Sequence, residues 1–229
     1  MSNTDSFIDE VSEEVRKDKL FGYLRRYGWI AVVVVLVLVG GTAFSEFRKA
    51  QATAAAEETG NAILAALEID DDTARADALA AIDAAGGAAA ITGLLQAANL
   101  SEMEDAAAAV AVLDGVATAA DTPDVYRDLA ALKAAMIVDG PLSLEERRAT
   151  LDDLAAPGAP FRLIAQEQIA MLNVEAGEID LALDQFSAIA LDADVTRGLR
   201  DRAFGMIVAL DGDVDELLAA FTAAFESDQ

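Results

Sequence analysis

Three arginines at a constant spacing of 35 residues are the feature of this sequence best suited to binding chemistry. They are Arg127, Arg162 and Arg197. Because a guanidinium group donates paired hydrogen bonds in a fixed fork, it matches the two oxygens of a carboxylate. Two interpretations stay open. Either each arginine pairs with acids of an adjacent helical hairpin and orders the stack, or the three together bind acidic segments of partner proteins.

The residue types that carry most enzyme chemistry are scarce in this chain. It has no cysteine and no histidine, and Lys133 is the only lysine after residue 49. The usual zinc and iron ligands, the commonest acid–base residue near neutral pH and most nucleophile arrangements are therefore missing. A carboxylate enzyme would need two acids that converge in an apolar pocket, whereas the acids here are spread over helical faces. We therefore expect that the chain has no catalytic activity and binds no cofactor.

Two acidic motifs have the composition of a metal site but not its full pattern. Asp211, Asp213 and Asp215 are similar to the start of a calcium loop, but Glu216 stands where that loop requires glycine. Residues 70–72 are three aspartates that we interpret as a solvated turn at a helix N-terminus, where negative charge is favourable. We expect no metal at either motif.

The net charge is confined to one part of the chain. From residue 50 onward 34 acids face nine basic residues, whereas the first 49 residues hold seven of each, so the net charge of −25 belongs to the larger part. Such a domain repels nucleic acid and anionic lipid, and we expect no nucleic-acid partner. Three explanations of this acidity stay open: it reflects a salty habitat, it serves the binding of basic partners, or it does neither.

Residues 27–45 contain no charged side chain, and we predict a transmembrane helix over residues 27–47. Nineteen residues in a helix span roughly 28 Å, close to the hydrocarbon thickness of a bilayer. A cleaved signal peptide is disfavoured because the preceding 26 residues are long and rich in acids. A buried strand is disfavoured because the apolar run over residues 30–39 is long for one.

The distribution of cations predicts the orientation of this helix. The segment before it holds five cations, whereas the cations that follow it closely are Arg48 and Lys49. We therefore expect residues 1–26 to be a cytoplasmic amphipathic tail and the rest to lie across a bacterial inner membrane, in the periplasm. Three interpretations of this tail stay open: it lies on the inner leaflet, it docks on another protein, or it is an ordinary stabilised tail with no binding role. Membrane lipid is one predicted partner.

An internal repeat predicts the architecture of the larger part. Segments that begin near Asp124, Ala159 and Asp194 align at an offset of 35 residues without gaps. Each unit is predicted to form two helices, with small residues where the helices approach closely and a large apolar residue near the end. Such hairpins must stack, which predicts an all-α solenoid with three repeats over residues 121–229 and irregular hairpins over residues 48–120. The matched packing positions are Ala135, Ala170, Gly205, Leu151, Phe186 and Phe221.

Two pairs of residues have the spacing of a capping box. Ser101 with Glu104 and Ser143 with Glu146 each place a hydroxyl three residues before a carboxylate. This spacing predicts that a helix begins directly after each serine.

The unit around Gly177-Glu178-Ile179-Asp180-Leu181-Ala182 resembles a tetratricopeptide repeat. Gly177 at the turn, Ala182 in the second helix, Phe186 beyond it and Ala170 before the turn carry the resemblance. The other two units depart from this pattern, since Arg147 and Leu217 replace the second-helix alanine and Leu142 replaces the glycine.

The whole arrangement is similar to the ancillary Sec-translocon subunit family (YfgM-like). The charged tail DEVSEEVRKDKLFGYLRRYG, one membrane helix and the stretches YRDLAALKAAMI and APGAPFRLIAQEQIAML carry this resemblance. It implies a non-catalytic periplasmic scaffold that associates with subunits of the Sec protein-export channel and with periplasmic chaperones. The alternative is an envelope scaffold for assembly of a respiratory or cell-division complex.

Overall fold

The computed structural model describes the backbone of residues 3–213 and the side chains of residues 25, 26, 29, 30 and 33–213. Every regular element in this described part is an α-helix, which confirms the predicted all-α fold class. The chain divides into two compact units, Met1–Glu58 and Thr59–Gln229, which are described separately below. The helices are α1 (Asn3–Leu67), α2 (Asp72–Ala80), α3 (Gly86–Glu102), α4 (Ala106–Thr118), α5 (Asp124–Met136), α6 (Leu144–Leu154), α7 (Arg162–Glu175), α8 (Ile179–Leu191) and α9 (Arg197–Ala209).

The described part of the first unit is α1 as far as Glu58, and it contains the whole predicted membrane segment. Residues 30–39 are helical, so the strand alternative is wrong. Each described side chain between residues 29 and 47 is exposed. Among the described residues, no helix combines the length and the apolar character needed to cross a membrane. The side chains of residues 27, 28, 31 and 32 of the predicted span, and those of residues 1–24 of the predicted tail, lie outside the described set.

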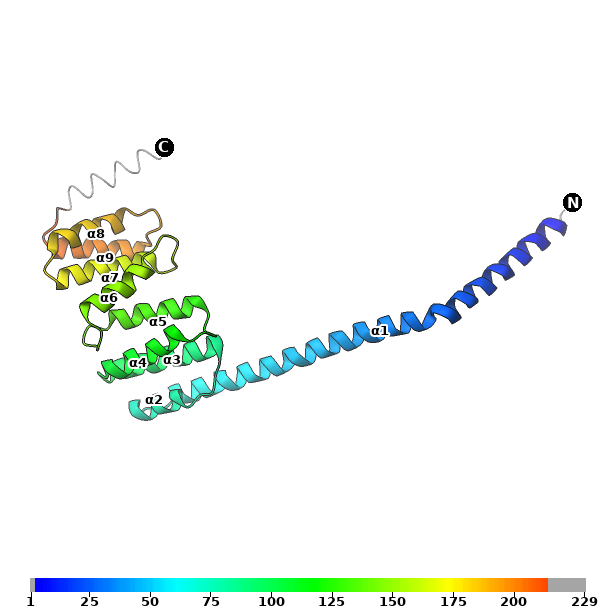
Figure 1. Cartoon of the computed structure of the whole chain (residues 1–229), viewed down its shortest axis with the longest axis horizontal. Helices are drawn as coiled ribbons and strands as arrows, with labels where there is room; N and C mark the ends of the chain where they lie inside the picture. Colours follow the sequence, from blue (N-terminus) through cyan, green and yellow to red (C-terminus); the bar gives the residue numbers. More distant parts are fainter. Residues whose placement is uncertain (1–2, 214–229) are drawn as a thin grey trace, which may run out of the picture. The chain divides into compact units, whose positions relative to one another are not determined.

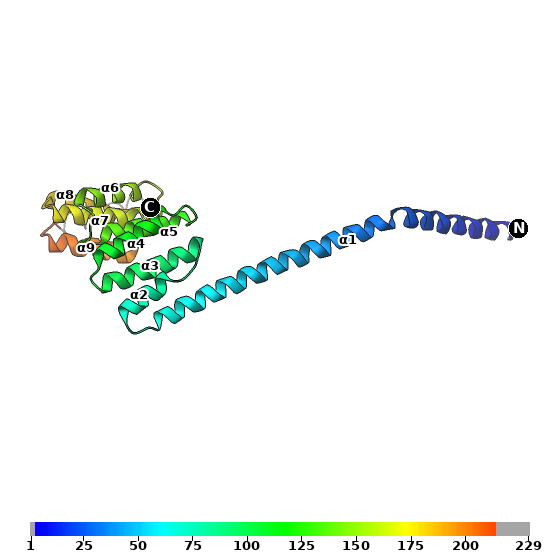
Figure 2. The same ribbon diagram turned by 60° about the horizontal axis from the view of Figure 1, so that its bottom comes forward.

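The second unit is a succession of short helices that pack on their neighbours in the chain. The main contacts join α2 to α3, α3 to α4, and so on to α8 and α9, with an additional contact between α3 and α5. Figures 1 and 2 show these helices following one another in chain order. This pattern of neighbour contacts is that of a helical solenoid. The helices α5 to α9 occupy the sequence in which we predict the repeats.

Most of the predicted packing positions are buried between neighbouring helices. Ala135 and Leu151 belong to an apolar cluster shared by α5, α6 and α7. Ala170, Ala182 and Phe186 belong to a second cluster shared by α7, α8 and α9. All five have no exposed surface. Alanine at such a position lets two helix backbones approach closely, so each cluster joins one hairpin to the next.

Two glycines of the predicted signature have different surroundings. Gly177 ends the turn between α7 and α8 with a φ of +80°, a left-handed conformation that glycine adopts without a steric penalty. Gly205 is exposed on α9, and a Cβ added there meets nothing within 4 Å. Phe221, the predicted packing position in the second helix of the third unit, lies outside the described residues.

One of the two predicted capping boxes is confirmed and the other is wrong. Ser143 begins α6: its hydroxyl accepts from the N–H of Glu146, and the Glu146 carboxylate accepts from the N–H of Ser143. Ser101 instead lies in the last turn of α3, where its hydroxyl donates to the carbonyl of Ala97. Helix α4 is capped by Asp105, whose side chain accepts from the N–H of Ala108, and residues 103–104 form the turn between α3 and α4.

Candidate functional site

A pocket of about 500 Å³ is formed by the N-terminal ends of α7 and α9 together with the loop that precedes α7. We call it the α7–α9 pocket. Gly158 in this loop has a φ of +84°, which suits glycine and turns the chain back toward α7. The pocket combines an apolar wall with charged groups. Its main lining side chains are Phe161, Leu163, Ile164, Leu199, Arg162 and Arg202.

Arg162 is the first residue of α7, and it joins the start of α7 to the end of α8. Its guanidinium donates to both carboxylate oxygens of Asp192, at 2.9 and 3.1 Å, and to Asp194 at 3.3 Å. The hydrogen bonds from Arg162 lower the pKa of Asp192, and the same bonds raise the pKa of Arg162. The guanidinium is therefore charged and fixed in place.

Arg202 on α9 is fixed by a carboxylate of α7. Its Nε and Nη2 atoms each donate to one oxygen of Glu167 at 2.7 Å. The Glu167 side chain is 8% exposed and the Arg202 side chain 57% exposed. This hydrogen bonding raises the pKa of Arg202. This pair was not predicted from the sequence, although the two residues are 35 apart and hold the same position in consecutive predicted repeats.

Both arginines keep donors for a ligand. Within the described part of the chain, Nε of Arg162 and Nη1 of Arg202 make no hydrogen bond. Because carboxylates already balance both charges, these donors suit a neutral acceptor such as a peptide carbonyl better than a further carboxylate. An apolar side chain of the same peptide can lie against Phe161, Ile164 and Leu199.

The structure does not bring the three predicted arginines into one site. Arg127 pairs with Asp124 of its own helix at 2.5 Å, and Arg197 is 92% exposed, with Asp201 of its own helix at 3.9 Å. Among the three, Arg162 alone pairs with an acid of the following unit and lines the α7–α9 pocket. Arg127 lies inside its helix, because α5 begins at Asp124, whereas Arg162 and Arg197 are the first residues of their helices.

The arginine that departs from the tetratricopeptide pattern is buried. Arg147 is 5% exposed, and its Nε donates to the carbonyl of Ala135 in the last turn of α5 at 2.8 Å. Its Nη1 donates to Glu175 at the end of α7, at 3.1 Å. The carbonyls at a helix C-terminus attract a cation, so Arg147 caps α5 while it joins α6 to α7.

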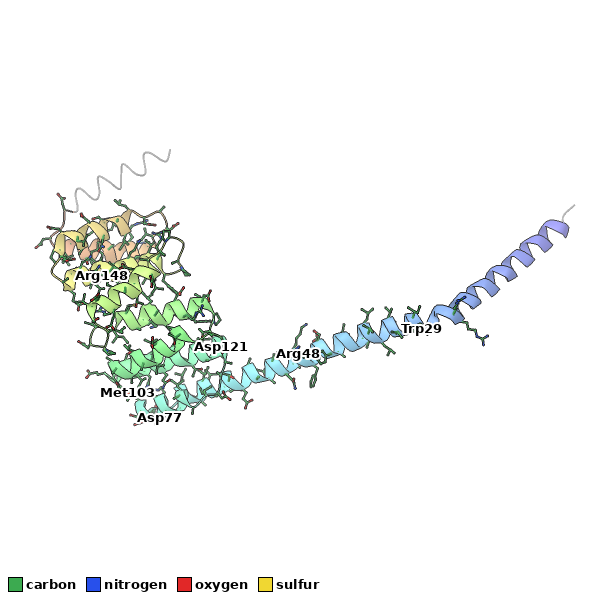
Figure 3. The ribbon with its side chains drawn as sticks, in the orientation of Figure 1. Trp29, Arg48, Asp77, Met103, Asp121 and Arg148 are labelled. Carbon is green, nitrogen blue, oxygen red and sulfur yellow. The ribbon has the colours of Figure 1, made fainter. Side chains whose placement is uncertain are left out.

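Next to Arg147, a second arginine begins a polar chain across three helices. Arg148, labelled in Figure 3, donates from α6 to the side-chain oxygen of Asn173 on α7. Asn173 has no exposed surface, and its amide donates to Gln185 on α8. Each buried polar atom among the described side chains has a hydrogen-bond partner, so this chain of bonds is fully satisfied. It joins the three consecutive helices α6, α7 and α8 through side-chain hydrogen bonds.

The acidic motifs form caps and turns in the described residues. Asp71 caps α2 by accepting from the N–H of Ala74, and Asp72 pairs with Arg75. No group of three acidic, histidine or cysteine side chains in the described part of the chain is placed to hold a metal. Asp215 and Glu216 of the calcium-like motif lie outside that part.

Comparisons of the chain with protein-family models, with curated proteins and with solved structures give no match. The residues and their geometry are therefore the basis of the functional argument.

Proposed function

We propose that this chain is a non-catalytic, membrane-anchored scaffold whose stack of helical hairpins binds partner proteins. The observation that carries the proposal is the α7–α9 pocket. It places donors of Arg162 and Arg202, each held by carboxylates, beside the apolar side chains of Phe161, Ile164 and Leu199. A stretch of bound chain uses both kinds of contact: donors for its carbonyl oxygens and an apolar surface for its side chains.

The proposed anchor is the charge-free segment 27–45. It is long enough for a bilayer, and its sequence lies within α1. The excess of lysine and arginine before it supports a cytoplasmic N-terminus, which places the second unit on the far side of a bacterial inner membrane. The resemblance to the ancillary Sec-translocon subunit family supports a role beside the protein-export channel and its chaperones.

Site-specific photo-crosslinking in intact cells tests the binding role. A photoreactive residue at Ile164, in the wall of the pocket, is compared with one at Leu181, an exposed residue of α8 that does not line the pocket. We expect adducts with export-channel subunits or periplasmic chaperones from position 164 and much weaker adducts from position 181. Equal adducts from both positions would contradict the pocket as the contact. Adducts with respiratory or cell-division proteins would overturn the role in export and favour the alternative scaffold.

The anchor and its orientation need a separate measurement. We expect the full chain to sediment with membranes and to stay there after extraction at high pH. A reporter fused after Gln229 that folds only in the periplasm is expected to be active. Recovery of the chain in the soluble fraction would contradict the anchor, and an inactive periplasmic reporter with an active cytoplasmic one would reverse the orientation.

A further inference from the structure

A second cavity, of about 300 Å³, is formed by α4, α5 and α6. Five of its lining residues are alanines: Ala107, Ala111 and Ala117 on α4, and Ala131 and Ala134 on α5. Val110 and Asp114 of α4, the turn before α6 and Thr150 of α6 supply the other lining residues. We call this cavity the alanine hollow. It shares no lining residue with the α7–α9 pocket.

The hollow follows from residue size at repeat positions. At the offset of 35 residues, Ala131 and Ala134 of α5 correspond to Gln166 and Ile169 of α7. Thr150 of α6 likewise corresponds to Gln185 of α8, which accepts a hydrogen bond from Asn173. The next unit therefore has larger side chains at all three positions. Smaller residues between the same kinds of helices leave space that the packing does not fill.

The polar groups of the hollow are acceptors. Asp114 lines it from α4, is exposed, and makes no ion pair or hydrogen bond through its carboxylate within the described residues. The Thr150 hydroxyl donates its hydrogen to the carbonyl of Glu146 at 3.1 Å, so toward a ligand it acts as an acceptor. No lysine or arginine lines the hollow.

We propose that the alanine hollow binds a lysine or arginine side chain, flanked by apolar residues, from a partner protein. The aliphatic stem of such a side chain packs on Ala111, Ala131 and Ala134, while its donor-only head reaches Asp114 and Thr150. The strongly acidic composition of the chain after residue 49 attracts a basic segment before contact. This site goes beyond the α7–α9 pocket, and its occupancy does not depend on that pocket.

Binding of short labelled peptides to the full chain in a non-ionic detergent tests the proposal. The probe is Ala-Leu-Arg-Leu-Ala with both ends blocked and a fluorescent label, and its partner probe carries norleucine in place of arginine. We expect the arginine peptide to bind about tenfold more tightly than the norleucine peptide, as the loss of one charge-assisted contact implies. Equal binding of the two probes would overturn the proposal.

A matched pair of charge variants separates the site from the general acidic field. Asp114→Asn and Asp184→Asn change the net charge equally, and Asp184 is an exposed aspartate of α8. We expect Asp114→Asn to weaken binding of the arginine peptide about tenfold and Asp184→Asn to leave it unchanged. An equal loss in both variants would show attraction by the acidic surface alone and would contradict the site.

A second pair of variants tests the cavity itself. Ala111→Leu places a larger side chain in the hollow, and Ala188→Leu makes the same change at an alanine of α8 that is likewise exposed but does not line the hollow. We expect Ala111→Leu to abolish measurable binding while Ala188→Leu binds normally, with unchanged circular dichroism in both. Normal binding by a folded Ala111→Leu chain would overturn the proposal. Ile164→Asp is expected to leave this binding intact, so failure of the α7–α9 pocket and failure of the hollow are distinguishable.

Discussion

Glu167 and Arg202 hold the same position in consecutive repeats, and they are bonded to each other. The pair joins α7 to α9 through two parallel N–H···O bonds of 2.7 Å. One repeat position thus supplies a buried acid in one unit and its cation in the next. The geometry is bidentate, which makes the contact directional as well as attractive.

Removal of the cation from this pair is expected to destabilise the fold. Arg202→Gln leaves the Glu167 carboxylate buried without its cation, which we expect to cost about 1–2 kcal/mol because Arg202 itself is more than half exposed. The double variant with Glu167→Gln is expected to recover part of this loss. Urea unfolding followed by circular dichroism measures both. Arg197→Gln, at a 92% exposed arginine, is the control and is expected to change nothing measurable; equal losses in Arg202→Gln and Arg197→Gln would contradict a specific pair.

Arg147 is expected to be the arginine whose loss costs the most stability. Arg147→Ala removes the bond to the Ala135 carbonyl and the pair with Glu175, and it leaves a cavity in a packed region. We expect a loss of about 3 kcal/mol in the free energy of unfolding. Thermal unfolding of this variant is compared with that of Arg127→Ala, which breaks a pair within a single exposed turn. A smaller loss of stability in Arg147→Ala than in Arg127→Ala would show that burial of the arginine does not determine how much it contributes to stability.

The pair between Arg162 and Asp192 predicts how stability depends on pH. Hydrogen bonding to Arg162 lowers the pKa of Asp192 below its ordinary value of 3.8 in the folded chain, so folding favours the ionised carboxylate. This stabilisation is complete above pH 3.8 and is lost as the pH falls through the lower pKa of the folded state. We expect Asp192→Asn to be less stable than the parent chain by about 1 kcal/mol at neutral pH, with the difference shrinking in acid. Unfolding experiments at a series of pH values measure this, and a difference that persists unchanged in acid would contradict the assignment.

The two serines with capping-box spacing are expected to respond differently to substitution. The hydroxyl and N–H of Ser143 lower the pKa of Glu146, so Ser143→Ala is expected to raise that pKa toward its ordinary value of 4.5 and to lower the melting temperature. Ser101→Ala removes only a bond to the Ala97 carbonyl within α3, and we expect it to leave α4 intact. Carboxylate titration by NMR and thermal unfolding measure the two effects. A larger loss of stability in Ser101→Ala than in Ser143→Ala would contradict this assignment and favour a helix that begins after Ser101.

The helices and their order follow from local patterns that the sequence displays. The 35-residue offset places apolar and small residues at the same turn of each unit, and Gly177 and Ser143 mark a turn and a helix start. Such signals depend on residues three or four apart, so they can be evaluated without knowledge of the neighbours. The prediction at Ser101 fails because the same spacing occurs where a helix ends: Ser101 lies in the last turn of α3 and Glu104 in the turn that follows.

The sequence by itself determined the all-helical class and the lack of histidine and cysteine side chains, and it predicts the 35-residue repeat. The tertiary structure decided which charges are buried and where space remains. Arg147 and Glu167 look like ordinary surface residues in the sequence, yet each is buried and pairs with a charged residue of another hairpin. The cost of removing a charge from water, and the shape of a cavity between alanines, depend on what packs against them. Those neighbours are distant in the chain, and no pattern within one helix identifies them.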